Sequence, residues 1–239
     1  MASLHTRGGD GSDEGLTDIG GGGKGGKGES VEEGVVSWRE RITGSIARSR
    51  KVRGGNYVQI ATVDEEGKPR CRTVVFRGFI DNVGGTAAAG GEALKMITDA
   101  RSEKVGQARL QPACEMVWWF GKSSEQYRIS GDLMFVGPEG VGSGDEERER
   151  QLQIARKSQW GSLSDPAREQ FYWSNPGLPY SGEGDPPPPG GRDSDGKVLP
   201  VPDTFLLVLL WPKEVKYLRL TDNFAQLDVV GGEATRVNP

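Results

Sequence analysis

One short stretch constrains the fold of this chain more than any other: residues 70–79, RCRTVVFRGF. Its Val, Phe and Thr side chains favour the pleated, half-buried surface of a β-strand over a helix. The same stretch carries Arg70, Arg72 and Arg77 around its apolar centre. Burying an unpaired charge is costly, so arginines on a core-forming strand require an anionic partner. The alternative is that they reach water from an edge strand or pair with Asp and Glu.

A second cationic cluster, residues 98–104 (TDARSEK), lies at the predicted start of a short helix. Ser102 is a favourable N-cap residue, so Arg101 and Lys104 are expected to flank the helix N-terminus. Free backbone N–H groups, the positive end of the helix dipole and two cationic side chains favour a bound phosphate there. The alternative is an ordinary capped helix whose charges are solvated. Together, the two clusters predict a site for one phosphorylated ligand.

The remaining periodicity predicts a chain made mostly of strands. Residues 56–63 form a strand that a turn at 64–69 joins to the stretch 70–79 as an antiparallel hairpin. Residues 125–136 alternate apolar and polar side chains, which places Gln126 and Arg128 together on the polar face. Further strands are predicted at residues 94–99, 114–120, 205–211 and, after a turn at Pro212, 214–220. Helices are predicted at residues 35–50, 102–110, 145–159 and 164–173.

These elements predict the fold class. Six or seven strands, mostly linked as hairpins, with three or four short helices, are typical of a mainly β, α+β protein built on an antiparallel, barrel-like sheet. Residues 205–211 (FLLVLLW) are apolar throughout, which predicts a strand buried on both faces. The expected core is small for a chain of 239 residues, which favours oligomerisation.

The distribution of glycine predicts the domain organisation. The chain has 37 glycines, gathered in patches, and only 34% hydrophobic residues. Residues 1–34 hold too little apolar surface to offset the entropy lost on ordering, so they are predicted to be a disordered tail. Residues 35–239 are predicted to form one domain with Gly- or Pro-rich insertions near residues 82–91, 137–144 and 175–202.

The cysteine and histidine content excludes several kinds of active site. Cys71 and Cys114 form no C-x-x-C pair, so neither a zinc site nor a disulfide framework is indicated, and both are expected to be buried in strands. The only histidine is His5, in the predicted tail. A Ser-His-Asp triad, a Cys-His dyad or a His-ligated metal therefore cannot form in the predicted domain. Any chemistry is expected to come from a cofactor.

Charge and hydropathy limit the partners. The net charge is −4 and the pI is about 5.3, so the chain lacks the general positive field of a nucleic-acid-binding protein. No apolar run approaches the roughly twenty residues that a membrane helix needs. The N-terminal residues contain no apolar signal-peptide core. An intracellular, cytoplasmic protein that binds neither nucleic acid nor membrane is expected.

The order of four segments carries a resemblance to a known family. These segments are YVQIATVDEEGKPRCRTVVFRGF, MITDARSEK, WWFGKSSEQYRISG and RKSQWGSLS. Together they resemble the FMN-binding split barrel of the pyridoxamine 5′-phosphate oxidase family, and most closely its oxidase-related branch with a T-D-x-R-S-x-K segment. The resemblance spans about residues 36–220. It implies an antiparallel split barrel with six to seven strands, and a homodimer that binds FMN in a cleft between its subunits.

The resemblance also implies which residues contact FMN. They come from the strand 70–79, the helix start near residue 102 and the strand 125–136: Arg72, Thr73, Val74, Val75, Arg77, Thr98, Arg101, Ser102, Lys104 and Gln126. Where the family has an arginine this chain has Glu103, and Arg101 is the expected substitute. Arg72 and Arg77 are five residues apart, so they face opposite sides of a regular strand. A bulge, or a ligand lying across the strand end, is required for both to reach one FMN.

The departures from the family pattern concern the substrate. The family's late Arg-x-His pair has no counterpart here, and the candidates for binding a small phosphorylated substrate are Arg156, Ser158 and Tyr217. No catalytic residue is assigned. The resemblance implies an FMN-binding flavoprotein, and an oxidoreductase whose substrate is unassigned. The alternatives are a flavin- or haem-binding sensor or carrier without turnover, and an interaction module that uses the Pro/Gly-rich segments.

Overall fold

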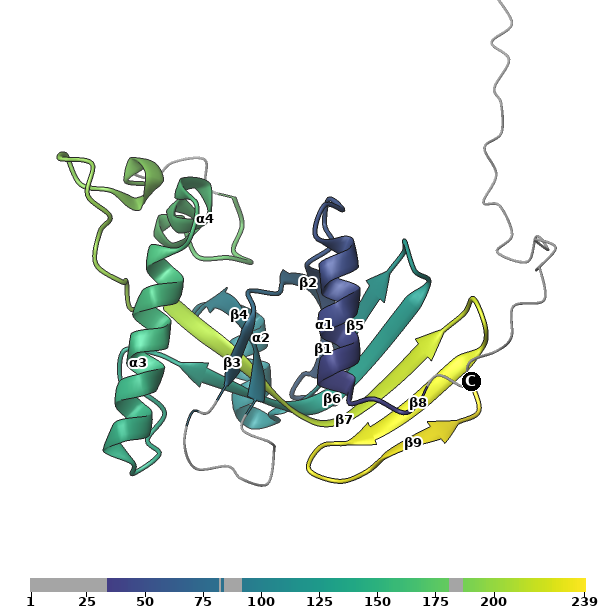
Figure 1. Cartoon of the computed structure of the whole chain (residues 1–239). Coiled ribbons are helices and arrows are strands. Elements are labelled where there is room, and N and C mark those ends of the chain that lie inside the picture. The colour runs from purple at the N-terminus through teal and green to yellow at the C-terminus, as the bar shows by residue number, and fades with distance from the viewer. Residues whose placement is uncertain (1–33, 82, 84–91, 181–186) are drawn as a thin grey trace, which may run out of the picture. The chain divides into compact units, whose positions relative to one another are not determined.

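The computed structural model describes residues 34–81, 83, 92–180 and 187–239, and residues 35–239 belong to one compact unit (Figure 1). Nearly all of the tail predicted at residues 1–34 lies outside the described residues. So do most of the insertion predicted near 82–91 and part of the insertion near 175–202. The insertion at 137–144 is a loop between a strand and a helix. The domain boundaries stay a prediction.

One antiparallel sheet of nine strands organises the described part of the chain. Its order is β2-β1-β5-β6-β7-β4-β3, with β8 on β7 and β9 on β8. The strands are β1 (Tyr57–Val63), β2 (Pro69–Val75), β3 (Phe79–Asp81), β4 (Glu92–Asp99), β5 (Ala113–Phe120), β6 (Glu125–Val136), β7 (Phe205–Arg219), β8 (Phe224–Val229) and β9 (Ala234–Val237). The predicted mainly β, antiparallel fold is confirmed, with more strands than the six or seven predicted.

The chain crosses from one edge of this sheet to the other between β2 and β3, which are the two ends of the main strand order. The Phe76 amide still donates to the Asn56 carbonyl next to β1 (2.8 Å), whereas the Arg77 amide donates to the Lys95 carbonyl on β4 (2.8 Å). Gly78 has a φ of 109°, a conformation that glycine adopts without a steric penalty. The predicted strand 70–79 is therefore two strands, and the covalent chain joins the two edges of a split barrel.

The strand β7 is longer than the sequence predicts. A turn was expected at Pro212, but β7 runs from Phe205 through to Arg219. Its register against β6 shifts between Ser130 and Gly131, opposite Pro212. Lys213, directly after Pro212, has no partner on β6 and is the extra residue of a bulge in β7. Proline cannot donate to a ladder, and bulges are among the places where a strand accommodates it. Gly131 allows the close approach, because a Cβ there would overlap the Trp211 carbonyl group. The predicted turn is wrong.

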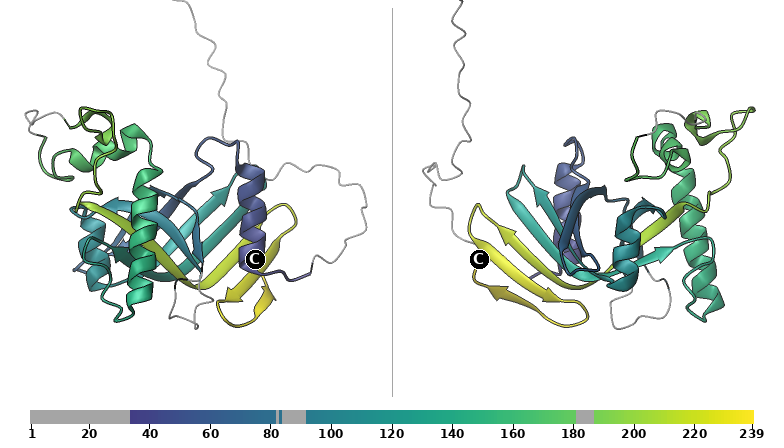
Figure 2. Two further views of the ribbon diagram at one scale, coloured as in Figure 1. Left: turned by 60° about the vertical axis from the view of Figure 1, so that its left-hand side comes forward. Right: turned by 180° about the vertical axis from the view of Figure 1, so that it is seen from behind.

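The described residues contain four α-helices, of which α1, α2 and α3 pack against the sheet (Figure 2). α1 begins at Ser37, whose hydroxyl caps the first turn, and it buries Trp38 and Ile42 in the main core. Figure 2 shows α3 and α4 beside one end of the sheet. The buried Arg156 guanidinium of α3 donates to the Phe205 carbonyl at the start of β7 (3.0 Å). The helices are α1 (Trp38–Ser49), α2 (Glu103–Leu110), α3 (Glu146–Gly161) and α4 (Asp165–Glu169), which continues as a 3₁₀ turn over Gln170–Tyr172.

The two cysteines differ in exposure. Cys114 on β5 is buried as predicted, and burial raises the pKa of its thiol to about 12. Cys71 is exposed, which corrects the prediction for that residue. It lies on β2, an edge strand that pairs only with β1 in the described part of the chain. An edge strand has fewer neighbours to cover its faces than a central strand such as β5.

A buried carboxylate joins α1 to β6 and β7. Glu125 is 2% exposed and accepts hydrogen bonds from Arg48 (2.8 Å), from the Tyr217 hydroxyl (2.7 Å) and from Ser123. Burial by itself raises the pKa of Glu125, but the hydrogen bonds from Ser123, Arg48 and Tyr217 outweigh it and lower the pKa below the usual range. The ionised form of Glu125 is therefore the form that the fold favours.

Replacing Gly131 with alanine is expected to destabilise the protein by about 3 kcal/mol, because backbone on β7 fills the space that the added Cβ needs. The free energy of unfolding in urea measures the effect. Gly161→Ala in α3 is the matched control, since nothing lies within 4 Å of a Cβ added there. That control is expected to be neutral or slightly more stable. Equal stabilities for Gly131→Ala and wild type would contradict the close approach of β6 and β7.

Replacing Glu125 with glutamine is expected to cost about 2 kcal/mol of unfolding free energy at pH 7, since the charge-assisted hydrogen bonds are lost. The lowered pKa of the folded carboxyl means that its contribution is complete above the ordinary pKa of glutamate. The contribution disappears as the pH falls through the lowered value. Urea unfolding between pH 7 and pH 3 should therefore show wild type and variant converging in acid. Glu147→Gln, at an exposed ion pair with Arg150, is the control and should change little. A difference for Glu125→Gln that does not depend on pH would contradict the assignment.

Candidate functional site

A cavity of about 460 Å³ opens where the end of β2, the end of β4 and the start of α2 face α4 and the chain that follows it. We call the first side the basic wall; it comprises Thr73, Val74, Val75, Arg77, Ile97, Thr98, Asp99, Ser102 and Lys104. We call the second side the aromatic wall; it comprises Ala167, Gln170, Phe171, Trp173, Ser174 and Pro176. The basic wall contains seven of the ten residues predicted to contact FMN: Thr73, Val74, Val75, Arg77, Thr98, Ser102 and Lys104.

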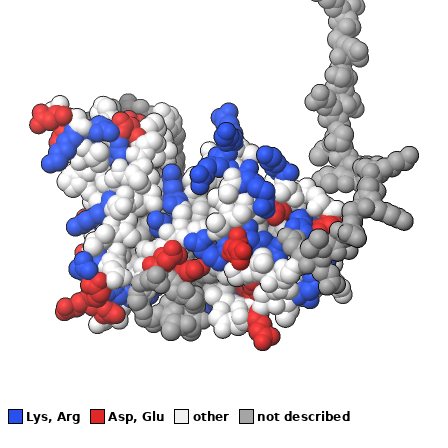
Figure 3. All heavy atoms as spheres, viewed as in Figure 1, with Lys and Arg blue, Asp and Glu red and all other residues white. Residues whose placement is uncertain are grey.

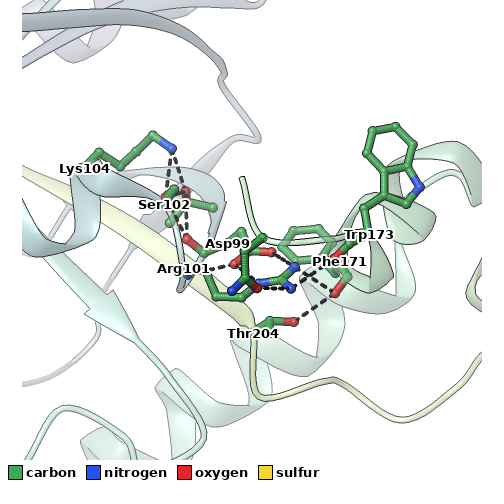
Figure 4. A network of polar contacts seen from close by, with 9 residues as sticks. Asp99, Arg101, Ser102, Lys104, Phe171, Trp173 and Thr204 are labelled. Carbon is green, nitrogen blue, oxygen red and sulfur yellow. Dashed lines mark hydrogen bonds and ion pairs between the residues drawn. The ribbon is translucent and has the colours of Figure 1, made fainter. Parts of the chain in front are cut away.

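The turn from β4 into α2 fixes the position of one cation. Ser102 precedes α2, but its hydroxyl donates to the Asp99 carbonyl (2.7 Å) and makes no side-chain cap. The Lys104 ammonium donates to the hydroxyls of Thr98 (2.9 Å) and Ser102 (3.0 Å). Figure 4 shows Lys104 reaching toward Ser102. No ion pair to Lys104 is present among the described residues. Burial, and then the charge of Arg72, lower the pKa of Lys104.

Arg72 lies behind the basic wall and adds a second positive charge. Its guanidinium donates to Thr62 (2.7 Å) and to the side-chain oxygen of Gln107 (2.9 Å), one turn beyond Lys104 on α2. These bonds tie β2 to α2 and hold Arg72 near Lys104. Burial lowers the pKa of Arg72, because the charged form loses hydration. Arg72 is not a residue that lines the cavity itself.

Arg77 brings a third positive charge to the cavity from the crossing between β2 and β3. Its Nε is buried and has no hydrogen-bond partner in the part of the chain that the structure describes. Burial lowers the pKa of Arg77 as well. A buried donor without a partner is costly, and an anionic or hydrogen-bond-accepting ligand in the cavity would satisfy it. The basic wall therefore has the charge and the free donor that a phosphorylated, polar-edged ligand such as FMN requires.

Arg101 and Gln126, also predicted to contact FMN, do not line the cavity. The Arg101 guanidinium is paired with Asp99 (2.7 Å) and turns toward the chain that carries the aromatic wall. Gln126 lies on β6 in a separate hollow lined by β7, β8 and the C-terminal residues. Their roles in FMN binding stay predictions.

None of the three residues predicted to bind substrate lines the cavity: Arg156 and Ser158 are both on α3, and Tyr217 is on β7. Arg156 is buried in α3 and donates to the carbonyls of Phe205 (3.0 Å) and Pro202 (2.8 Å). Ser158 is exposed on α3. Tyr217 is buried on β7, where its hydroxyl donates to Glu125. The structure gives them no common binding surface.

The aromatic wall is the part of the site that the sequence did not reveal. Its aromatic residues follow α4 in the run FYWSNP, where the sequence predicts only the end of a helix. The one sequence signal that could have indicated this wall is a tryptophan, Trp173, in a polar turn just before Asn175-Pro176. The contact with residues 98–104 depends on tertiary packing and has no signature in either segment.

Two other kinds of site find no support within the described ranges. No group of three or more His, Cys, Asp or Glu side chains there is arranged to hold a metal ion. No helix there is long and apolar enough to span a membrane.

Comparisons with known proteins agree with the geometry. Residues 35–137 match the family model for the pyridoxamine 5′-phosphate oxidase, FMN-binding domain. Pyridoxine/pyridoxamine 5′-phosphate oxidase 2 of Arabidopsis thaliana is 30% identical over 213 residues, which cover 86% of this chain and 98% of the relative.

Two solved structures extend the comparison. A pyridoxamine 5′-phosphate oxidase-related, FMN-binding protein of Nostoc punctiforme shares 34% identity with a TM-score of 0.68, over 86% of this chain and 100% of the other. PhzG of Burkholderia lata, solved with tetrahydrophenazine-1-carboxylic acid, shares the fold at 16% identity with a TM-score of 0.60, over 84% and 90% of the chains. The split sheet and the basic wall agree with these similarities. The chain belongs to the pyridoxamine 5′-phosphate oxidase-like family of FMN-binding proteins.

Proposed function

We propose that the cavity binds FMN and that the protein is an FMN-dependent oxidoreductase. The observation that carries the proposal is the convergence of Arg72, Arg77 and Lys104 without a carboxylate ion pair to any of them in the described residues. Burial lowers the pKa of all three cations, so each is held in a position that disfavours its charge. A bound phosphate and a polar ring edge would compensate for that cost.

The geometry supports a division of roles along the basic wall. Lys104 and the hydroxyls of Thr98 and Ser102 lie together at the start of α2, where helix N–H groups favour a phosphate. Arg77 lies at the end of β2, where its guanidinium can face the polar edge of the isoalloxazine ring. Thr73, Val74 and Val75 offer strand backbone and apolar surface beside it.

We also propose a homodimer in which Gln126 reaches the FMN held by the other subunit. In a single chain Gln126 lines a different hollow, which it shares with Arg128 and Lys216. A contact across a subunit interface would reconcile that position with the role that the family resemblance implies.

When bound, FMN would supply two-electron redox chemistry, taking a hydride from a substrate and passing the electrons to O₂ or another acceptor. The contribution of this chain would be positive charge from Arg77 near the ring as negative charge develops there. The two walls would limit the access of water. Pyridoxamine 5′-phosphate is the first substrate to test, because the Arabidopsis relative is named for its oxidation.

The second candidate function is a sensor or carrier that binds flavin, or haem in its place, without turnover. It is favoured by the engagement of the predicted substrate residues elsewhere: Arg156 with backbone carbonyls and Tyr217 with Glu125. Anaerobic mixing of the FMN-loaded protein with pyridoxamine 5′-phosphate separates the two candidates. Bleaching of the flavin absorbance supports an oxidase. An unchanged spectrum with tight FMN binding shows that pyridoxamine 5′-phosphate does not reduce the flavin, and it favours the carrier.

Replacing Lys104 with methionine is expected to weaken FMN binding by about tenfold to a hundredfold, because one charge-assisted contact with the phosphate is lost. Titration of the flavin-free chain with FMN, followed by flavin fluorescence, measures the dissociation constant. Lys157→Met on the exposed side of α3 is the matched control and should bind as wild type does. A wild-type protein that gains no flavin absorbance with FMN would overturn the proposal.

The pH dependence of FMN binding gives an independent test of Lys104. Burial and Arg72 lower its pKa, so it loses its proton at a lower pH than an ordinary lysine. Phosphate binds the charged ammonium, and the affinity of wild type should therefore fall as the pH rises through that lowered value. Lys104→Met has no such group and should lack this part of the decline. Parallel pH profiles for the two proteins would contradict the role of Lys104.

A further inference from the structure

The aromatic wall presents an exposed tryptophan on a fixed backbone. Trp173 lines the cavity and is 52% exposed. The residue two positions earlier, Phe171, is buried and packs edge-on against Trp160 and Phe205. The aromatic wall therefore rests on a packed core cluster. The Trp173 indole, whose apolar surface is among the largest of any side chain, stays half-exposed at its surface.

Arg101 supplies the connection that holds this wall against the basic wall. Its Nε and one terminal nitrogen donate to the two carboxylate oxygens of Asp99 (2.9 and 2.7 Å). The other terminal nitrogen donates to the Trp173 carbonyl (3.0 Å) and to the side-chain oxygen of Asn175 (2.9 Å). Figure 4 shows this network, with the Trp173 indole projecting away from it.

A second contact fixes the same segment. Thr204, immediately before β7, donates its hydroxyl to the Phe171 carbonyl (3.2 Å), and its own carbonyl accepts from the Ala100 amide (2.7 Å). The backbone on both sides of Trp173 is thus tied to the turn that begins the basic wall. Among the residues that the structure describes, none makes a hydrogen bond or a ring contact with the Trp173 indole.

We propose that Trp173 is the surface on which a planar conjugated ring packs inside this cavity, and that Arg101 is the positioning residue that holds Trp173 there. The inference rests on the proposed function, since it requires a ring-bearing ligand between the two walls. That ring is either the isoalloxazine of FMN or the heteroaromatic ring of a substrate. Both offer the same chemistry to an indole face: a flat, polarisable surface that stacks in an offset arrangement.

The geometry also explains why an arginine occupies position 101. The planar guanidinium engages the Asp99 carboxylate with two donors and still has a nitrogen directed at Trp173 and Asn175. A lysine ammonium is a single point charge and cannot span both groups. Because Asp99 already neutralises Arg101, this residue is less suited to holding a phosphate than Lys104 is.

The first experiment compares Trp173→Ala, Trp173→Phe and wild type in the full-length chain with two probes. One arm titrates the flavin-free protein with FMN, and the other titrates the FMN-loaded protein with pyridoxal 5′-phosphate. Trp173→Ala is expected to weaken one of the two by about three- to tenfold, and Trp173→Phe is expected to restore most of the affinity. Loss in the FMN arm assigns the flavin ring, and loss confined to the other arm assigns a substrate ring.

Tyr180→Ala is the matched control, because Tyr180 is an aromatic residue of the same segment, 97% exposed, and does not line the cavity. It should bind both probes as wild type does. Wild-type affinity of Trp173→Ala for both probes, or an equal loss in Tyr180→Ala, would overturn the inference and leave the proposed function standing. A wild-type chain that binds no FMN would remove both.

The positioning role of Arg101 requires a readout that general destabilisation would not move. Binding of the probe whose affinity depends on Trp173 should shield the indole from quenching by acrylamide. The fluorescence of Trp173 is obtained by subtracting the signal of the same protein with Trp173→Phe from the signal of each protein. Arg101→Lys is expected to lose this protection and to weaken the same probe as Trp173→Ala does. Asn175→Ala removes one contact only and should give a smaller loss. Full protection and wild-type affinity in Arg101→Lys would contradict the role.

Discussion

The structure depends on the crossing at residues 76–78, where the chain leaves one edge of the sheet and joins the other. Two hydrogen bonds from adjacent residues define it: the Phe76 amide donates to the β1 side and the Arg77 amide donates to β4. This crossing joins the two edges of the open sheet by a covalent link rather than by a ladder. It also places Arg77 in the cavity while Arg72 stays on β2 beside α2, so the two arginines need not share one face of a strand.

The second constraint is electrostatic. The surface of this protein mixes both signs of charge (Figure 3) and the net charge is −4, yet Arg72, Arg77 and Lys104 gather around one cavity without a carboxylate partner in the described residues. The buried Glu125, by contrast, is paired with Arg48 and accepts from the hydroxyls of Ser123 and Tyr217. The buried Arg156 is satisfied by backbone carbonyls. Cations that have no carboxylate partner cost stability, and a ligand that binds them would return it.

Much of this arrangement could be predicted from the sequence, where local pattern and burial agree. The alternation over residues 125–136 gave the bounds of β6, and TDARSEK marked the turn that holds Lys104. Local pattern failed where a distant partner decides the outcome. Pro212 favours a turn, but β7 continues through it with a bulge at Lys213, opposite Gly131 of the neighbouring strand. The strands β8 and β9 are short and partly polar, so only the pairing of β8 with β7 and of β9 with β8 reveals them. The aromatic wall likewise depends on Arg101, whose partners are more than seventy residues away.

The exposed edge strand β2 carries a consequence for self-association. An open strand edge invites a second chain to extend the sheet, which is a common start of aggregation. Here that edge begins with Pro69, which has no N–H to offer, and continues with Arg70 and Arg72, whose like charges would meet their own copies. Sheet extension through β2 is thereby discouraged. The homodimer proposed above would therefore form through surfaces other than this edge, which leaves the crossing and its cavity free of an intruding strand.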